Sequence, residues 1–160
     1  MIKIDRKFTE TLIEKAANSE RRRTNYNFHT DLSDTLQRML NVMNTDTYVC
    51  PHKHINPDKR EAFILLKGKV LVVEFDDSGN KTDFVILDNE NASYGCEIEL
   101  KSWHTIICLQ ENTVIYEVKD GPYDVATDKV FAPWAPKEGD ANCLEYNRKL
   151  MVDLAILDKI

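Results

Sequence analysis

The sequence has few cysteines and no long hydrophobic run. Its four cysteines are scattered along 160 residues, and none of them forms a C-x-x-C pair. Cysteines scattered in this way favour free thiols in a reducing compartment over a disulfide framework. No apolar run approaches the ~20 residues that a membrane-spanning helix needs, and the first residues lack the apolar core of a secretory signal. We therefore expect a cytoplasmic protein with no membrane association.

The chain also lacks an excess of basic residues. Its formal net charge is −6, which argues against binding to nucleic acid or to an anionic membrane surface. Hydrophobic residues make up 42% and charged residues 30%, a balance typical of globular proteins. The length suits one domain with a hydrophobic core. Basic residues do cluster at Arg21, Arg22 and Arg23, either as a solvated face or as part of an anion-binding site.

The middle of the chain predicts a β-rich fold. Short runs of β-forming residues alternate there with turn signals such as Asp76-Asp77-Ser78-Gly79-Asn80. The predicted strands cover residues 47–54, 62–66, 69–75, 82–87, 93–99, 104–109 and 113–118. Many short strands at near-regular spacing favour an antiparallel sandwich or barrel.

Helical patterns flank this region. Residues 6–18 carry an apolar stripe, and Asp31 suits the N-cap of a second helix reaching residue 43. Asp140 suits the N-cap of a C-terminal helix, after an extended segment at 131–136 that we expect to pack on the barrel exterior or cover one mouth.

We therefore predict three parts within one domain. Residues 1–46 form a helical segment packed on the barrel, residues 47–123 form the barrel, and residues 124–160 form the extended segment and the C-terminal helix.

Three of the four histidines stand at positions suited to a metal ion. His52 and His54 are two residues apart, so their side chains share one face of a strand. If the strand faces point into a small barrel, these imidazoles converge with Glu61 and His104 near one mouth. Three imidazoles and a carboxylate suit one divalent transition metal, and ligand type alone leaves iron(II), manganese, nickel and zinc open. The alternative is a set of polar residues on an exposed strand edge.

The spacing of these residues resembles the first motif of the cupin family. That motif is an H-x-H pair, a glutamate a few residues on, and a glycine after six more. This chain has His52-x-His54, then Glu61, then Gly68, with six residues before the glycine. The interval from His54 to Glu61 also holds six residues, longer than usual, and Asn56-Pro57-Asp58-Lys59 accounts for the extra length as a widened hairpin loop.

The second cupin motif is matched at its two ends. Gly95 and His104 fit its first glycine and its histidine, whereas Glu99 and Lys101 stand where proline and glycine are usual. The resemblance implies a single cupin barrel, a double-stranded β-helix of the jelly-roll type. The fold class we expect is thus mainly β, with N-terminal helices and a C-terminal helix around that barrel.

A closer resemblance covers nearly the whole chain. It rests on the segments Arg22-Arg23-Thr24-Asn25-Tyr26-Asn27-Phe28-His29, Tyr48-Val49-Cys50-Pro51-His52-Lys53-His54, Phe75-Asp76-Asp77-Ser78-Gly79, Ser102-Trp103-His104-Thr105, Glu117-Val118-Lys119-Asp120-Gly121-Pro122-Tyr123 and Phe131-Ala132-Pro133-Trp134-Ala135-Pro136. Together they look like the WbuC family of cupin-fold metalloproteins, which occur in bacterial surface-polysaccharide gene clusters. The resemblance implies a bound divalent metal and a role near sugar or polysaccharide metabolism, without implying a known reaction.

The polar segment after the first helix supplies further candidates. We expect it to fold over the barrel mouth, where Arg22, Arg23 and Asn27 would bind the phosphate or carboxylate of a ligand. His29 or Tyr26 would then act as general acid or base beside the metal. The alternative is an ordinary loop in which His29 bonds to the backbone.

Three functions remain open at this point. The first is a metal-dependent enzyme that isomerises, epimerises or cleaves a small anionic metabolite, such as a sugar derivative. The second is an iron(II)-dependent dioxygenase, and the third is a non-catalytic, metal-dependent binding protein for a small molecule. Since dimerisation commonly covers barrel edges, a homodimer is a further expectation.

Overall fold

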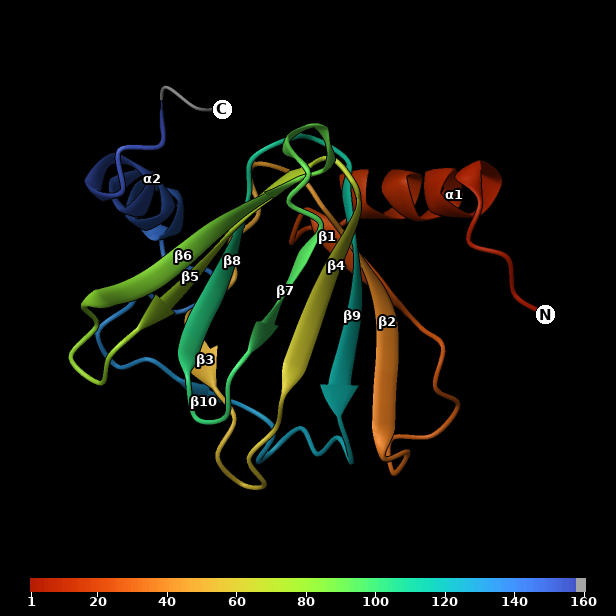
Figure 1. Cartoon of the computed structure of the whole chain (residues 1–160), viewed down its shortest axis with the longest axis horizontal. Coiled ribbons are helices and arrows are strands. Elements are labelled where there is room, and N and C mark those ends of the chain that lie inside the picture. The colour runs from red at the N-terminus through yellow and green to blue at the C-terminus, as the bar shows by residue number, and fades with distance from the viewer. Residues whose placement is uncertain (158–160) are drawn as a thin grey trace.

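The computed structural model describes residues 1–157, which form two facing β-sheets with a helix near each end of the chain (Figure 1). The helices and strands are α1 (Arg6–Ala17), β1 (Arg23–Asn27), β2 (Leu36–Met43), β3 (His52–Lys53), β4 (Glu61–Lys67), β5 (Lys69–Phe75), β6 (Lys81–Asp88), a 3-10 turn η1 (Asn89–Asn91), β7 (Gly95–Ile98), β8 (Trp103–Cys108), β9 (Thr113–Asp120), β10 (Val130–Phe131) and α2 (Cys143–Asp153). The last residues of the predicted C-terminal part, 158–160, lie outside the described residues.

Each sheet is antiparallel and draws its strands from distant parts of the chain. Within residues 1–157 the first sheet has the order β1-β2-β9-β4-β7 and the second the order β10-β3-β8-β5-β6. From β2 to β10 the chain crosses from one sheet to the other at every step except the β5–β6 hairpin, which is the connectivity of a jelly roll. The predicted mainly β barrel with flanking helices is confirmed.

The space between the sheets is filled by apolar side chains from alternate strand positions. On β4, for example, Phe63 and Leu65 are each 3% exposed, while Ile64 between them points outward and is 44% exposed. The buried members of this inner core are Met43, Phe63, Leu65, Val70, Val72, Leu87, Ile98, Ile106, Cys108 and Ile115. The core draws these side chains from both sheets and holds the sheets together.

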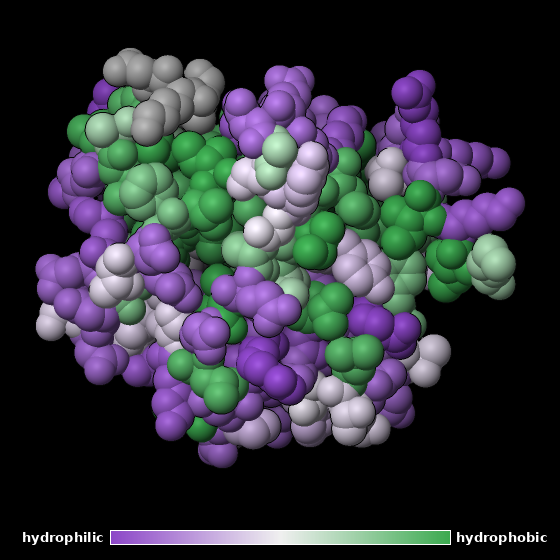
Figure 2. Space-filling view, in the orientation of Figure 1, coloured by the Kyte–Doolittle hydropathy of each residue, from purple (hydrophilic) through white to green (hydrophobic). Residues whose placement is uncertain are grey.

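Both helices cover outer sheet faces. Leu12 and Ala16 of α1 pack on outward-facing residues of β2 and β9. On the second sheet, α2 packs beside Trp134, whose ring centroid lies 4.9 Å from that of Phe75. Figure 2 shows hydrophobic residues gathered between α2 and the β5–β6 hairpin. The aromatic side chain at 134 therefore packs on the barrel exterior, as the sequence predicts.

The predicted second helix is wrong, because residues 36–43 form strand β2. This strand pairs with β1 on one side and with β9 on the other. Leu40 and Val42 face α1, while Met43 joins the inner core. Apolar residues on both faces of one strand mimic helical spacing, and pairing on both edges outweighs that local signal. Residues 23–43 therefore belong to the barrel rather than to a helical segment.

The expected N-caps also differ in the structure. The Asp31 carboxylate accepts a hydrogen bond from the backbone N–H of Ser33, 2.8 Å away, and so stabilises a turn. Asp140 accepts one from the backbone N–H of Lys137, also at 2.8 Å, while α2 begins only at Cys143. Aspartate serves turns as readily as helix starts, which is why the pattern misleads.

Among the described residues, no helix has the length and apolar character that crossing a membrane requires.

Candidate metal centre

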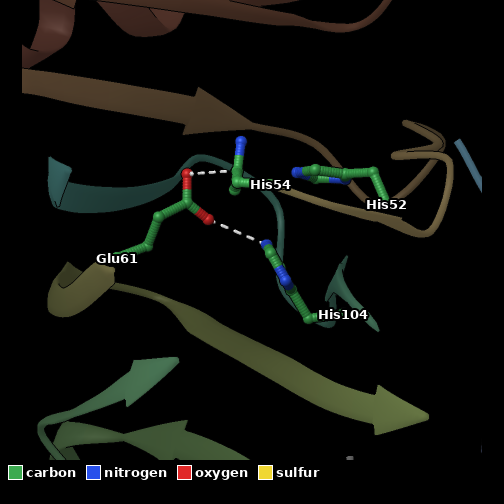
Figure 3. A group of neighbouring side chains, drawn as sticks. All are labelled: His52, His54, Glu61 and His104. Carbon is green, nitrogen blue, oxygen red and sulfur yellow. Dashed lines mark ion pairs between the residues drawn. The ribbon is translucent and has the colours of Figure 1, made fainter. Parts of the chain in front are cut away.

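Three strands bring the four predicted ligands together. His52 lies on β3 directly opposite His104 on β8, and Glu61 begins β4 in the other sheet. His54 follows β3, on the same side as His52. One ligand atom from each residue lies within 4.8 Å of the others, and all four residues are no more than 4% exposed (Figure 3).

The backbone fixes how each imidazole is presented. His52 Nδ1 lies 3.0 Å from the carbonyl oxygen of Cys50, and His104 Nδ1 lies 3.1 Å from that of Ser102. His54 Nδ1 bonds to the carbonyl oxygen of Asp128. A carbonyl can only accept, so each Nδ1 carries the proton and each Nε2 keeps a lone pair. Hydrogen bonds from Nδ1 to backbone carbonyls commonly hold metal-binding histidines in place.

The Nε2 atoms of His54 and His104 face Glu61. The Nε2 atom of His104 lies 2.8 Å from Oε2 of Glu61, and Nε2 of His54 lies 3.2 Å from Oε1 (Figure 3). These two nitrogens and Oε2 are nevertheless buried without a hydrogen-bond partner among the described residues. Lone pairs that face one another across 3 Å need a cation between them. The residues therefore fit a divalent metal ion.

Electrostatics keeps the ligands in their metal-binding forms. Burial alone would raise the pKa of the Glu61 carboxyl, but positive charge beside it, including the ammonium group of Lys119 at 3.5 Å, holds that pKa well below its usual range. Burial, reinforced by Lys129, lowers the pKa of His52 well below its usual value. Glu61 is therefore a carboxylate and His52 a neutral imidazole, as metal binding requires.

A buried ion network supports the centre from one side. The Asp128 carboxylate bonds to Lys59 and lies 2.9 Å from Nζ of Lys119, and these three side chains are between 1% and 4% exposed. Lys119 Nζ also lies 3.5 Å from Glu61 Oε1. Asp128 thus contacts His54 through its backbone and reaches Glu61 through Lys119. Nothing in the spacing of the ligands points to this residue.

A cavity of about 400 Å³ lies beside the four ligands. Its lining includes three of the four ligands, His52, Glu61 and His104, and polar residues outnumber apolar ones around it. The polar and charged wall residues are Arg21, Arg23, Thr24, Asn25, Asn27, His29, Gln37, Asn41, Glu117, Lys119, Tyr123 and Lys129. The site can therefore admit a small polar ligand beside the metal position.

The predicted N-terminal segment is divided between the cavity and the surface. Arg23, Asn27 and His29 line the cavity. Arg22 and Tyr26 do not: Arg22 pairs with Asp46 at 2.8 Å, and the Tyr26 ring packs 4.9 Å from that of Phe8 under α1. Residues 23–27 form strand β1, so side chains alternate and Tyr26 points away from Asn27. His29 Nδ1 lies 3.1 Å from the Arg38 backbone, so its other ring nitrogen is the one left for a ligand.

Three charged wall residues were missed by the sequence prediction. Glu117 and Lys119 alternate with apolar residues on β9, opposite Phe63 and Glu61 of β4. Charged residues on the inward face of a predicted strand were the signal that could have identified them. Lys129 comes from the segment before β10, and no local pattern marks it.

The fold and the site define a cupin barrel with a candidate metal centre. The chain belongs to the family described as a domain of unknown function (DUF6016), whose sequence model matches residues 4–87. A search of curated proteins found no significant match. The WbuC resemblance therefore stays a prediction.

Solved structures of cupin-fold proteins share this architecture. The capsular polysaccharide assembling protein CapF from Staphylococcus aureus is 16% identical with a TM-score of 0.58, covering 71% of this chain and 30% of CapF. L-ribose isomerase from Cellulomonas parahominis is 14% identical with a TM-score of 0.55, covering 73% of this chain and 72% of the isomerase. An oxalate oxidase is 17% identical with a TM-score of 0.54, covering 78% of this chain and 62% of the oxidase. This chain thus spans less than a third of CapF, and identities this low show a common fold alone.

Proposed function

We propose that this protein is a metal-dependent enzyme that binds one divalent ion through His52, His54, Glu61 and His104. Its substrate is a small anionic metabolite, and the reaction is an isomerisation, epimerisation or lyase step. One observation carries the proposal: three oriented Nε2 lone pairs and a charged carboxylate meet beside a cavity of about 400 Å³ that is lined by more polar than apolar residues. A bound divalent ion would act as a Lewis acid and polarise a carbonyl or hydroxyl group of the substrate.

The chain's own residues supply the proton transfer that such a reaction needs. Burial, together with the charge of Glu61, raises the pKa of the Glu117 carboxyl in the cavity wall. A carboxyl group with a raised pKa is suited to accept and return a proton near neutral pH. Asn41 Nδ2 donates to Glu117 Oε2 at 2.5 Å and so fixes its orientation. His29, which the sequence predicts as acid or base, lines the same cavity.

The wall composition supports a sugar derivative as substrate. The side-chain amides of Asn25, Asn27 and Asn41 offer both donors and acceptors, which suit hydroxyl groups. Arg23 and Lys129 add positive charge for a carboxylate or phosphate. A place in surface-polysaccharide metabolism is supported by the WbuC resemblance of the sequence. CapF, described as a capsular polysaccharide assembling protein, shares the fold.

Metal content tests the first part of the proposal. The tag-free protein is reconstituted with iron(II), manganese, nickel or zinc, dialysed and measured by mass spectrometry. We expect about one equivalent in the native chain and in His29→Ala, a control histidine outside the four-residue cluster. We expect loss of that equivalent in His52→Ala and His104→Ala. A native chain that stays metal-free in all four metals would overturn the proposal.

Turnover separates the enzyme from its two alternatives. The metal-loaded protein is incubated in D₂O with a panel of sugar acids and sugar phosphates, and deuterium incorporation is followed by NMR. Deuterium exchange at carbon, abolished in Glu117→Gln, supports isomerase, epimerase or lyase chemistry. Oxygen uptake with iron(II) would instead indicate a dioxygenase. Ligand binding without either signal would indicate a non-catalytic binding protein.

A further inference from the structure

The buried charges around the metal centre balance when no metal is counted. The Asp128 carboxylate bonds to Lys59 and Lys119, and Lys119 also contacts Glu61. Glu117 and Lys129 of the cavity wall are the remaining charged side chains here, close enough to act electrostatically on one another and on Glu61. With Glu117 ionised and Lys129 protonated, three carboxylates accompany three ammonium groups.

A divalent ion at the four ligands therefore leaves the centre with two uncompensated positive charges. Buried net charge is costly in a protein interior, so an opposite charge must accompany it. The rim adds to the excess, because Arg21 and Arg23 share the single carboxylate of Glu138 at 2.5 Å and 2.7 Å. Although the whole chain carries a net charge of −6, the metal-loaded cavity is electropositive.

Lys129 is the cation placed to receive the compensating charge. It lines the cavity, and no carboxylate oxygen of the described residues lies within 4.0 Å of its ammonium group. Val130 lies opposite Lys53 in the β10–β3 pair, so Lys129 stands level with His54 beside the metal position. Lys59 and Lys119, in contrast, already form ion pairs with the Asp128 carboxylate. A partly buried, unpaired ammonium group beside a cation is unfavourable unless an anion binds there.

We propose that the ligand of this site is a polyhydroxylated dianion, whose anionic group binds Lys129 and whose hydroxyl groups contact the asparagines of the wall. This inference rests on the proposed function, because the charge excess arises only with the metal bound. Asn25 Nδ2 donates to Asn27 Oδ1 at 2.6 Å, which leaves Asn27 Nδ2 as a donor to the ligand. A sugar phosphate and a sugar dicarboxylate both meet this description.

Calorimetric titration of the metal-loaded full chain tests the inference. The probes are D-glucose, D-gluconate, D-glucarate and D-glucose 6-phosphate, which span neutral, singly and doubly charged compounds of similar size. We expect at least one dianion to bind about tenfold or more tightly than glucose, since charge-assisted hydrogen bonds contribute that much. The stronger of the two dianions identifies phosphate or dicarboxylate as the anionic group.

Variants at residue 129 give the second measurement. Lys129→Met should weaken binding of the preferred dianion about tenfold, Lys129→Arg should retain most of it, and neither should change glucose binding. Lys67→Met removes an exposed ammonium group of β4 and serves as the matched control. Metal content is measured on every variant, so that a lost ion is not mistaken for a lost anion contact.

The outcomes separate this inference from the proposed function. Suppose the native chain binds one equivalent of metal. If glucose then binds as tightly as both dianions, or if neither dianion binds at millimolar concentration, the inference alone is overturned. An unchanged dianion affinity in Lys129→Met also overturns it alone. Absence of metal binding in the native chain overturns both, because it removes the charge excess.

Discussion

The buried carboxylate of Asp128 gives the sharpest test of how the site is held together. Its side chain is 2% exposed and bonds to Lys59, which is 1% exposed, and to Lys119, which is 4% exposed. Asp128→Asn keeps the shape of the side chain but removes its charge. Two buried ammonium groups would then lose their strongest partner. Breaking a buried ion pair from one side costs about 3–5 kcal/mol.

That cost is a large part of the stability of a domain. Native domains are stable by roughly 5–15 kcal/mol, so the variant should lose about a fifth or more of its free energy of unfolding. For a chain of this length the melting temperature should fall by roughly 6–20 °C. Urea unfolding followed by circular dichroism gives the free energy, with chelator present in every sample. This condition removes any contribution from bound metal.

A surface pair of the same chemistry provides the control. Asp120 pairs with Arg60, whose side chain is 67% exposed, so Asp120→Asn should leave the unfolding midpoint nearly unchanged. If Asp128→Asn were as harmless as Asp120→Asn, the ammonium groups would be solvated or uncharged in the folded protein. The charge balance described for the metal centre would then be refuted.

Two further predictions concern a turn and an exposed carboxylate. Gly68 has a φ of +86°, and a Cβ there would lie 2.3 Å from Oγ1 of Thr113, so Gly68→Ala should cost about 2 kcal/mol or more of unfolding free energy. Gly139→Ala, with a φ of +95° and open space, should cost only about 1 kcal/mol, and equal losses would contradict the clash. Hydrogen bonds from Lys149 and Lys81 lower the pKa of Asp153 to about 2, which NMR titration can measure. Because that pKa is depressed, the contribution of Asp153 to stability is present above its usual pKa of about 4 and is lost as the pH falls towards 2. A measured pKa near 4 would show that Lys149 and Lys81 do not bind the Asp153 carboxylate.

Local spacing made the ligands and most barrel strands readable in the sequence. His52 and His54 share a face because side chains alternate on any extended segment, whatever the segment packs against. The strand β5 was predicted with its observed bounds, because a run of valine, leucine and phenylalanine between turn residues has one favourable conformation. The fold class followed from the number and spacing of such runs.

The nature of residues 23–43 was decided by tertiary pairing. The same apolar spacing fits a helix or a strand buried on both faces, and only the pairing of β2 with β1 and β9 selects the strand. The alternation of β1 then places Arg23 and Asn27 at the cavity and Tyr26 under α1. If residues 23–27 are read as a loop, nothing predicts that the side chains of Tyr26 and Asn27 point in opposite directions.

The sequence by itself therefore determined a β-rich barrel and four candidate metal ligands, since both depend on periodicities of a few residues. Only the tertiary structure decided what surrounds those ligands. The carbonyl that orients His54 belongs to Asp128, which is 74 residues away in the chain. Lys129 precedes β10, the edge strand of the second sheet. The pairing of β10 with β3 brings it to the same centre. Contacts between such distant segments depend on the closed barrel, and no short-range pattern records them.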